Sequence, residues 1–322
     1  MDIKILKSVP KKTERLIIGT HNGIFHSDEV VAIAILCLAH KDSEVCIIRT
    51  RDTEELKKCD ILVDIGGGVF DHHQPGGNGK RENNIPYASA GLIWDYYGFS
   101  LLDSFCNSIS DYISVRHKIW PAIDDEIISK VDLEDNGFDT SPHLFSFIPN
   151  FLPDWRAGVN PDYDSAFNEV LSIVIKILKN EIKTRISAIL ASEKIDSLFK
   201  SDEENLDEYT PFCNHILELP CQTIPWKESV INHNKSTESD EDIVNFVIFP
   251  YPNGGWAAQC VPPSMEEEFN QRIPFPKEWA GQTDNLPIIS GVQDATFCHN
   301  GCFFVRANTY SGIRKMCNLA MN

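Results

Sequence analysis

The chain has 322 residues, of which 42% are hydrophobic, and it carries a formal net charge of −18 at pH 7. This length allows one large or two ordinary domains with hydrophobic cores. The excess of acid argues against a protein that coats nucleic acid non-specifically, because such proteins present a basic surface. The longest apolar stretch, residues 30–39, is too short to span a bilayer.

The cysteines and the N-terminus bear on the compartment. Ten cysteines occur without a Cys-x-x-Cys array, which favours a reducing environment with mostly buried thiols. Residues 1–7 lack the small-residue cleavage site of a signal peptide and the Arg and Ser enrichment of a transit peptide. We therefore expect an intracellular protein of the cytoplasm or nucleus, with the mitochondrion as an alternative, and no membrane association.

The first part of the chain alternates apolar strands with helices. After a polar lead-in at 1–14, the runs 16–20, 45–48 and 61–63 predict buried strands. A buried helix at 29–39 and a short helix starting near Asp52 separate them, and this alternation predicts a parallel sheet. We expect 61–63 to be the central strand and the pair Val69-Phe70 to form a further strand.

The middle of the chain is expected to be mainly helical. A polar loop at 74–84, rich in turn residues, is a candidate lid or substrate-contact loop. Helices are expected at 88–97, 101–115 and 124–133, and an amphipathic connector helix at 164–198. The acidic run at 201–209 marks the boundary between a catalytic domain at 1–199 and a C-terminal substrate-binding domain at 200–322.

The last part of the chain is expected to be richer in strands. Its β patterns lie at 216–219, 244–249, 256–261 and 302–305, with helical segments near 265–271 and 314–321. The predicted fold class is therefore α/β, with a parallel-sheet domain followed by a smaller α+β domain.

Carboxylates and imidazoles gather where the predicted strands end. They are His21, His26, Asp28, Asp64, Asp71, His72 and His73. A single Asp or His after a strand is usually a turn or cap residue, but loops at the carboxyl ends of parallel strands converge. This donor set, which lacks cysteine, suits Mn²⁺, Fe²⁺, Co²⁺ or Zn²⁺ better than Mg²⁺ or Ca²⁺. Because the donors exceed what one ion needs, two divalent ions are predicted, with Mn²⁺ favoured and Mg²⁺, Co²⁺ or Zn²⁺ as alternatives.

At these residues the chain resembles the Asp-His-His (DHH) phosphoesterase superfamily and, within it, the eukaryotic melanocyte-proliferating-gene family. Gly19-Thr-His-Asn-Gly-Ile-Phe-His-Ser-Asp-Glu29 and Phe70-Asp-His-His-Gln74 carry the resemblance, with further matches at 63–67, 89–92, 135–137 and 224–228. It covers nearly the whole chain and implies a phosphodiester hydrolase, namely a 3′–5′ RNA exonuclease that uses a two-metal-activated water. Alternatives are a small-substrate hydrolase (pyrophosphate, cyclic dinucleotides or short oligonucleotides) and a non-catalytic protein that retains the metals.

The resemblance also implies roles for individual residues. One ion would be held by His21, His26 and Asp64, and the other by Asp28, Asp64, His72 and Asp135, with Asp64 as the bridge. Asp132 and Asp135 lie on one side of a helix end, so either could be the last ligand. The Asn-Gly after Asp135 resembles the family's wording and favours Asp135. Asp71 is expected to orient an imidazole. His73 is expected to contact a phosphate oxygen or protonate the leaving oxygen, unless it is only structural.

The C-terminal part contains the nearest match to the family's glycine-rich substrate-binding motif, at residues 305–315. The candidates for binding single-stranded RNA or a short oligonucleotide are Arg306, Ser311, Gly312 and Arg314, with Lys315 as a further phosphate contact. The family usually has His at 306 and Gly-Gly at 311–312, so the substrate preference stays open, and a basic helix start on the surface is an alternative. Trp155 and Trp226 are candidate platforms for stacking bases, although core packing is favoured for each.

Overall fold

The computed structural model describes residues 3–10, 15–138, 141–200 and 212–322. The chain divides into two compact units, Met1–Ile186 and Ser187–Asn322. The acidic run at 201–209, which was predicted to be the boundary, lies outside the described residues, and the domain limits 1–199 and 200–322 stay a prediction. No helix among the described residues has both the length and the apolar character needed to cross a membrane.

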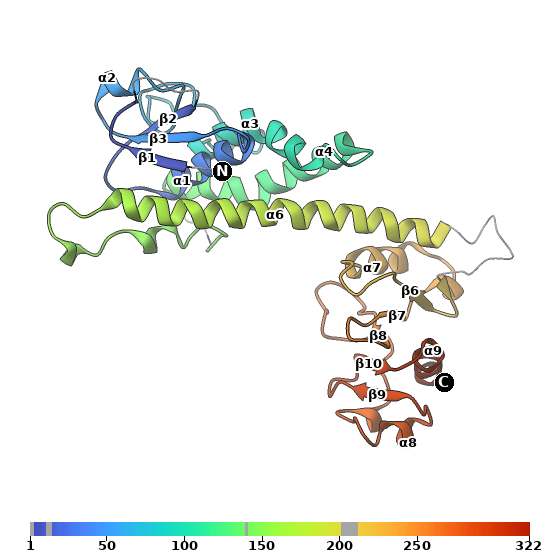
Figure 1. Cartoon of the computed structure of the whole chain (residues 1–322). Helices are drawn as coiled ribbons and strands as arrows, with labels where there is room; N and C mark the ends of the chain where they lie inside the picture. Colours follow the sequence, from blue (N-terminus) through green and yellow to red (C-terminus); the bar gives the residue numbers. More distant parts are fainter. Residues whose placement is uncertain (1–2, 11–14, 139–140, 201–211) are drawn as a thin grey trace. The chain divides into compact units, whose positions relative to one another are not determined.

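The N-terminal unit is built on a parallel sheet with the strand order β1-β3-β2-β4 (Figure 1). All three strand pairings are parallel, as the alternation of strands and helices predicted. Every residue of β3 and nearly all of β2 are buried, which suits strands covered on both faces. The strands are β1 (Ile3–Leu6), β2 (Leu16–Thr20), β3 (Val45–Arg49) and β4 (Ile61–Leu62).

Three strand predictions in this unit are wrong. The expected lead-in contains β1, which pairs with β3. Residues 61–62 pair only with β2 among the described strands, so β4 lies at an edge of the sheet and not at its centre. The pair Val69-Phe70 forms a turn, and Val69 is 70% exposed. Two apolar residues between a glycine turn and a polar motif are too few to establish a strand.

Helices cover the sheet and carry part of the site. The helix α1 is buried from Ser27 to Leu38 and packs against α3, which agrees with its apolar composition on nearly every face. The helix predicted at 101–115 is divided between the end of α3 and the start of α4, and a π-helical turn at Asp124–Ile128 joins α4 to α5. The helices are α1 (Ser27–Ala39), α2 (Thr53–Leu56), α3 (Ser89–Cys106), α4 (Tyr112–Ile123), α5 (Ser129–Asp135) and α6 (Tyr163–Lys200).

The C-terminal unit contains a separate mixed sheet with the order β5-β6-β7-β8-β10-β9. Its β6–β7 pairing is parallel and its other pairings are antiparallel. Residues 265–271 form turns and not the predicted helix, whereas the predicted helix near 314–321 is part of α9. The α/β fold class is confirmed. The elements are β5 (Phe212–Cys213), β6 (Ile216–Glu218), α7 (Lys227–Ser236), β7 (Phe246–Pro250), β8 (Trp256–Cys260), α8 (Leu286–Ser290), β9 (Ala295–Cys298), β10 (Phe304–Ala307) and α9 (Tyr310–Met321).

Candidate metal centre

Asp64 lies just beyond β4, and its backbone has a positive φ of 59°. Residues other than glycine rarely adopt this left-handed conformation, which costs on the order of 1–3 kcal/mol. Two main-chain hydrogen bonds hold it in place, from Val63 N to Gly19 O at 2.9 Å and from Asp64 N to Phe70 O at 3.0 Å. The side chain is 2% exposed, so this turn delivers one carboxylate into a buried space at the end of the sheet.

The two oxygens of Asp64 face different imidazoles. Oδ2 lies 3.3 Å from His21 Nε2, while Oδ1 lies 3.1 Å from His73 Nδ1 and 3.5 Å from His72 Nδ1. The Ser89 hydroxyl, at the start of α3, donates to Oδ1 at 3.2 Å. One carboxylate is thus shared between two groups of donors, as a bridging ligand would be.

The predicted ligands come together in three overlapping sets. Within each set the candidate ligand atoms lie within 4.8 Å of one another. The sets are His21, His26, Glu29 and Asp64; Asp64, Asp71, His72 and His73; and His26, Asp28 and Asp135. Every predicted metal or catalytic residue of the N-terminal unit except Asp132 therefore belongs to one cluster, although its role stays a prediction.

Glu29 is a member of this cluster that sequence reasoning missed. Its carboxylate is fully buried and lies 3.1 Å from His21 Nε2. The backbone N–H of His26 donates to both oxygens of Glu29, at 2.9 and 2.8 Å, at the start of α1. Its position in the sequence could have indicated this, because Glu29 directly follows Asp28 and lies three residues after His26, which caps the helix.

The structure separates the two candidates at the end of α5. Asp135 Oδ2 lies 2.8 Å from His72 Nε2, inside the cluster. Asp132 is fully buried and accepts hydrogen bonds from Arg81 Nη1 at 2.7 Å and from Gly91 N at 2.9 Å. A Cβ on Gly91 would lie 1.9 Å from Asp132 Oδ2, so this close approach requires glycine. The geometry favours Asp135 as the ligand. Asp132 instead links α5 to α3 through its hydrogen bond from Gly91 N.

Asp71 is hydrogen-bonded to His73. Its Oδ1 accepts from His73 N and lies near His73 Nδ1, both at 3.0 Å, and its Oδ2 accepts from Gly67 N at 2.7 Å. Burial alone would raise the pKa of Asp71, but the backbone N–H groups of His73 and Gly67 and the imidazole together hold it below its usual value. The His73 side chain is 63% exposed, so its ring is fixed at one edge and open to solvent at the other.

Two buried polar atoms of the cluster lack hydrogen-bond partners among the described residues. They are Asp28 Oδ1 and His72 Nδ1. Burial and the neighbouring charges of Asp64, Asp135 and Glu29 raise the pKa of Asp28. Buried polar atoms without partners are rare in native proteins, and a bound cation would satisfy both. Five carboxylates and four imidazoles in one cluster form a donor set that could hold divalent metal ions.

Nearby carboxylates raise the pKa of two imidazoles of the cluster, His21 and His72. Burial lowers the pKa of His21, but hydrogen bonds to Asp64 and Glu29 outweigh it and raise the pKa to about 10. Burial also opposes protonation of His72, yet its hydrogen bond to Asp135 and the nearby carboxylates raise its pKa. Without metal, the His21 ring is therefore charged at neutral pH and occupies the place of a cation.

Several of the predicted substrate-binding residues make contacts with other residues of the C-terminal unit. The guanidinium carbon of Arg306 lies 3.8 Å from the centroid of the Tyr251 ring. Ser311, in the first turn of α9, is exposed. A Cβ on Gly312 would lie 2.3 Å from the Asp294 carboxylate. The remaining contacts are Arg314 Nη2 to Cys213 O at 3.2 Å and Lys315 Nζ to Gly291 O at 2.9 Å.

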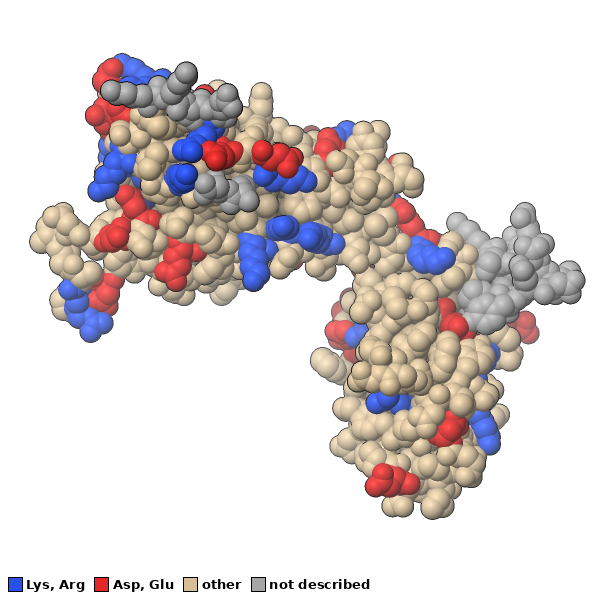
Figure 2. Space-filling view, in the orientation of Figure 1, with Lys and Arg blue, Asp and Glu red and all other residues tan. Residues whose placement is uncertain are grey.

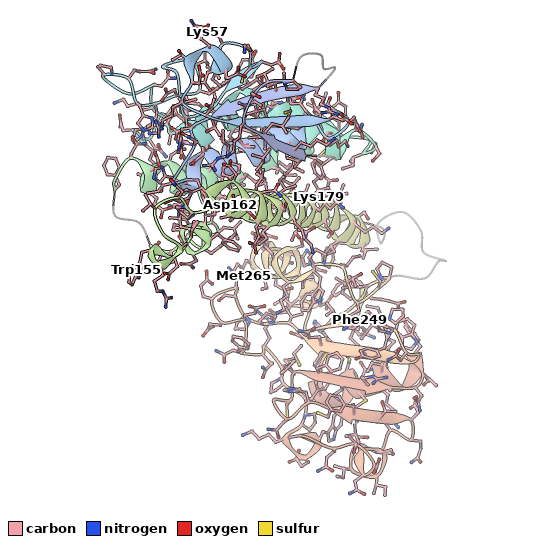
Figure 3. The ribbon with its side chains drawn as sticks, turned by 60° about the vertical axis from the view of Figure 1, so that its left-hand side comes forward. Lys57, Trp155, Asp162, Lys179, Phe249 and Met265 are labelled. Carbon is pink, nitrogen blue, oxygen red and sulfur yellow. The ribbon has the colours of Figure 1, made fainter. Side chains whose placement is uncertain are left out.

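The two tryptophans differ from each other in burial. Trp226 is buried in a hydrophobic cluster that includes Leu217 and Val247, as the core-packing interpretation predicted. That interpretation is wrong for Trp155, which is 86% exposed (Figure 3). Trp155 therefore remains a candidate for stacking a base.

The raised pKa of His21 predicts that metal binding releases a proton. Because the folded-state pKa of His21 is about 10, its proton must leave before the ring can bind a metal at neutral pH. Apparent Mn²⁺ affinity should rise about tenfold per pH unit for each proton displaced, up to the folded-state pKa. Titration calorimetry in buffers of different ionisation enthalpy measures the protons released. Affinity independent of pH, with no protons released, would contradict this.

Substitutions at the end of α5 distinguish the ligand from its neighbour. Asp135→Asn should lower Mn²⁺ affinity more than Asp132→Asn does, since residues behind a ligand typically contribute about 10–100-fold. Asp132→Asn should instead lower the free energy of unfolding by about 1–3 kcal/mol, because Arg81 keeps its other partner, Asp124. Metal analysis and urea unfolding of both variants check the ranking. The reverse ranking in metal content would move the ligand to Asp132.

Comparisons with known proteins identify a family. The MYG1_exonuc family model, described as "Uncharacterised protein family (UPF0160)", matches residues 17–321. The MYG1 exonuclease of Mus musculus is 30% identical over 328 residues, covering 92% of this chain and 80% of that protein. The MYG1 exonuclease of Homo sapiens is 29% identical over 330 residues, covering 92% and 81%.

A similar match extends outside animals. The MYG1 protein of Chlamydia muridarum is 29% identical over 315 residues, and the match covers 95% of this chain and 95% of that protein. No solved structure matches the chain. The family model spans nearly all of the sequence and confirms the predicted resemblance, so the chain belongs to the MYG1_exonuc family.

Proposed function

We propose that the chain is a metal-dependent 3′–5′ exonuclease that hydrolyses single-stranded RNA. The observation that carries this proposal is the buried Asp64, whose two oxygens face two groups of donors. A carboxylate shared in this way is the common feature of two-metal phosphoester hydrolysis. Membership of a family named for exonucleases supports a hydrolase that acts on phosphodiester bonds.

The residues of the cluster would hold two ions. One would lie among His21, His26, Glu29 and Asp64, and the other among Asp28, Asp64, His72 and Asp135. Two divalent ions supply a water of lowered pKa and neutralise charge on the phosphoryl oxygens. The mixture of nitrogen and oxygen donors favours Mn²⁺, with Co²⁺, Zn²⁺ or Mg²⁺ as alternatives.

His73 is suited to deliver a proton. Its Nδ1 lies 3.0 Å from Asp71 Oδ1 and 3.1 Å from Asp64 Oδ1, so two carboxylates fix the orientation of the ring. The other ring nitrogen, Nε2, is on the side away from these carboxylates. A proton held at Nε2 could pass to the leaving oxygen of the cleaved phosphodiester.

The distribution of charge supports a substrate that is held at few phosphates. Basic and acidic side chains are interspersed over the face drawn in Figure 2. No long basic stripe for tracking along nucleic acid is seen on that face, and the chain carries 47 acidic against 29 basic residues. Arg306 and the exposed Trp155 are the candidates that we propose for contacting RNA.

All ten cysteines are free thiols, in keeping with an intracellular location in the cytoplasm or nucleus.

Removing the charge of Asp64 tests the mechanism. Asp64→Asn keeps the shape of the side chain but loses the charge shared by both metal groups. Hydrolysis should fall by about 10³-fold or more, because ion binding and the nucleophile depend on the same carboxylate. Turnover and metal content are measured together, with circular dichroism as the check on folding. Near-wild-type turnover by a folded Asp64→Asn variant would exclude the two-metal mechanism.

The polarity of digestion tests the substrate assignment. End-labelled single-stranded RNA should be trimmed from its 3′ end in Mn²⁺, so a blocked 3′ end protects and a blocked 5′ end does not. Circular RNA should remain intact. Cleavage of circular RNA would indicate an endonuclease, and turnover of pyrophosphate or dinucleotides alone would indicate a small-substrate hydrolase. Matched DNA substrates and a chelator serve as controls.

A further inference from the structure

Arg51 lines the cavity beside the metal cluster. This cavity has a volume of about 650 Å³, enough for a nucleotide, and Arg51 is the one arginine or lysine among the described residues that line it. The other charged or titratable residues that line the cavity are members of the metal cluster. They are His21, His26, Asp64, Asp71 and His73.

The backbone on both sides of Arg51 is fixed. Thr50 N donates to Thr20 O at 2.9 Å, which continues the pairing of β3 with β2. Asp52 N donates to the Thr50 hydroxyl at 3.1 Å, and Asp52 in turn caps α2 by accepting from Glu54 N at 2.8 Å. The residue is thus held between a strand end and a helix start, so its position beside the cavity is set by the fold.

The guanidinium of Arg51 has no hydrogen bond or ion pair with any described residue, although it is exposed and next to a cluster of carboxylates. Arg49, two residues earlier, is different. It is buried, pairs with Asp164 at 2.7 Å and donates to Gly23 O at 2.8 Å. Arg49 therefore has a structural partner set, whereas Arg51 is available for a ligand.

We propose that Arg51 binds a phosphate group of the substrate beside the metal cluster, an assignment that rests on the proposed function. The planar guanidinium presents two N–H groups that match two oxygens of a phosphodiester. The carboxylates that line the same cavity, Asp64 and Asp71, already face imidazoles, so an anionic substrate is the partner left for this cation. The guanidinium holds the phosphate before and during the reaction, and it acts mainly on substrate affinity.

Arg51→Ala tests this role with kinetics at several salt concentrations. KM should rise about 10–100-fold, the loss expected for hydrogen bonds to a charged group, while kcat stays within about threefold. The slope of log(kcat/KM) against log[salt] should become shallower by about 0.7, one phosphate contact on a single strand. Mn²⁺ content should not change. Arg51→Lys should keep the salt slope but recover only part of the affinity, because it lacks the two-pronged geometry.

Lys57→Ala is the matched control. Lys57, labelled in Figure 3, directly follows α2 and is close to Arg51 in the chain. The change removes the same charge from an exposed lysine that pairs with Glu54 at 2.7 Å. KM and the salt slope should stay at their wild-type values.

Two results would overturn the role of Arg51. One is an Arg51→Ala variant with unchanged KM and salt slope. The other is a variant that loses Mn²⁺, which would mean that Arg51 organises the ligands. If the wild type leaves RNA intact but hydrolyses pyrophosphate or a dinucleotide, the exonuclease assignment fails. The same KM comparison on that small substrate then still decides the role of Arg51.

Discussion

The crowding of carboxylates in one buried space is the constraint on which the N-terminal unit depends. Like charges at such short separations repel strongly when water is excluded, so each carboxylate needs a compensating partner. The chain supplies imidazoles, the N–H and hydroxyl of Ser89, and the N–H of Gly67. Asp28 still keeps an unsatisfied oxygen. The remaining imbalance is what makes this space attractive to cations.

Much of this arrangement could be predicted from local sequence. Strands β2 and β3 and the helix α1 are continuous apolar runs, and such runs indicate burial whatever the tertiary context. The cluster residues are adjacent in sequence to the ends of these elements, so their convergence follows from the geometry of parallel strands. Asp64 is the clearest example, because the glycines after it allow the sharp turn that points it inward.

Features set by long-range pairing could not be predicted. The segment 3–6 joins the sheet only because β3 offers it an edge, and the position of β4 at the other edge likewise depends on which strands pair. Asp132 and Asp135 share one side of a helix end, so spacing alone cannot separate them. The contact that distinguishes their surroundings comes from Arg81, 51 residues away from Asp132 in the sequence. Glu29 was not predicted as part of the cluster, because an acidic residue in the first turn of a helix is common without any such role.

The attachment of Arg81 has a consequence for how substrate reaches the site. Arg81 Nε and Nη2 bind Asp124 and its Nη1 binds Asp132, each at 2.7 Å, and Asn78 donates to Val69 O at the same distance. Swinging the segment 74–84 away would break a buried ion pair, so the fold opposes the hinged motion that a lid would need. The segment 74–84 loses its conformational entropy when the protein folds. Substrate binding therefore does not have to order it.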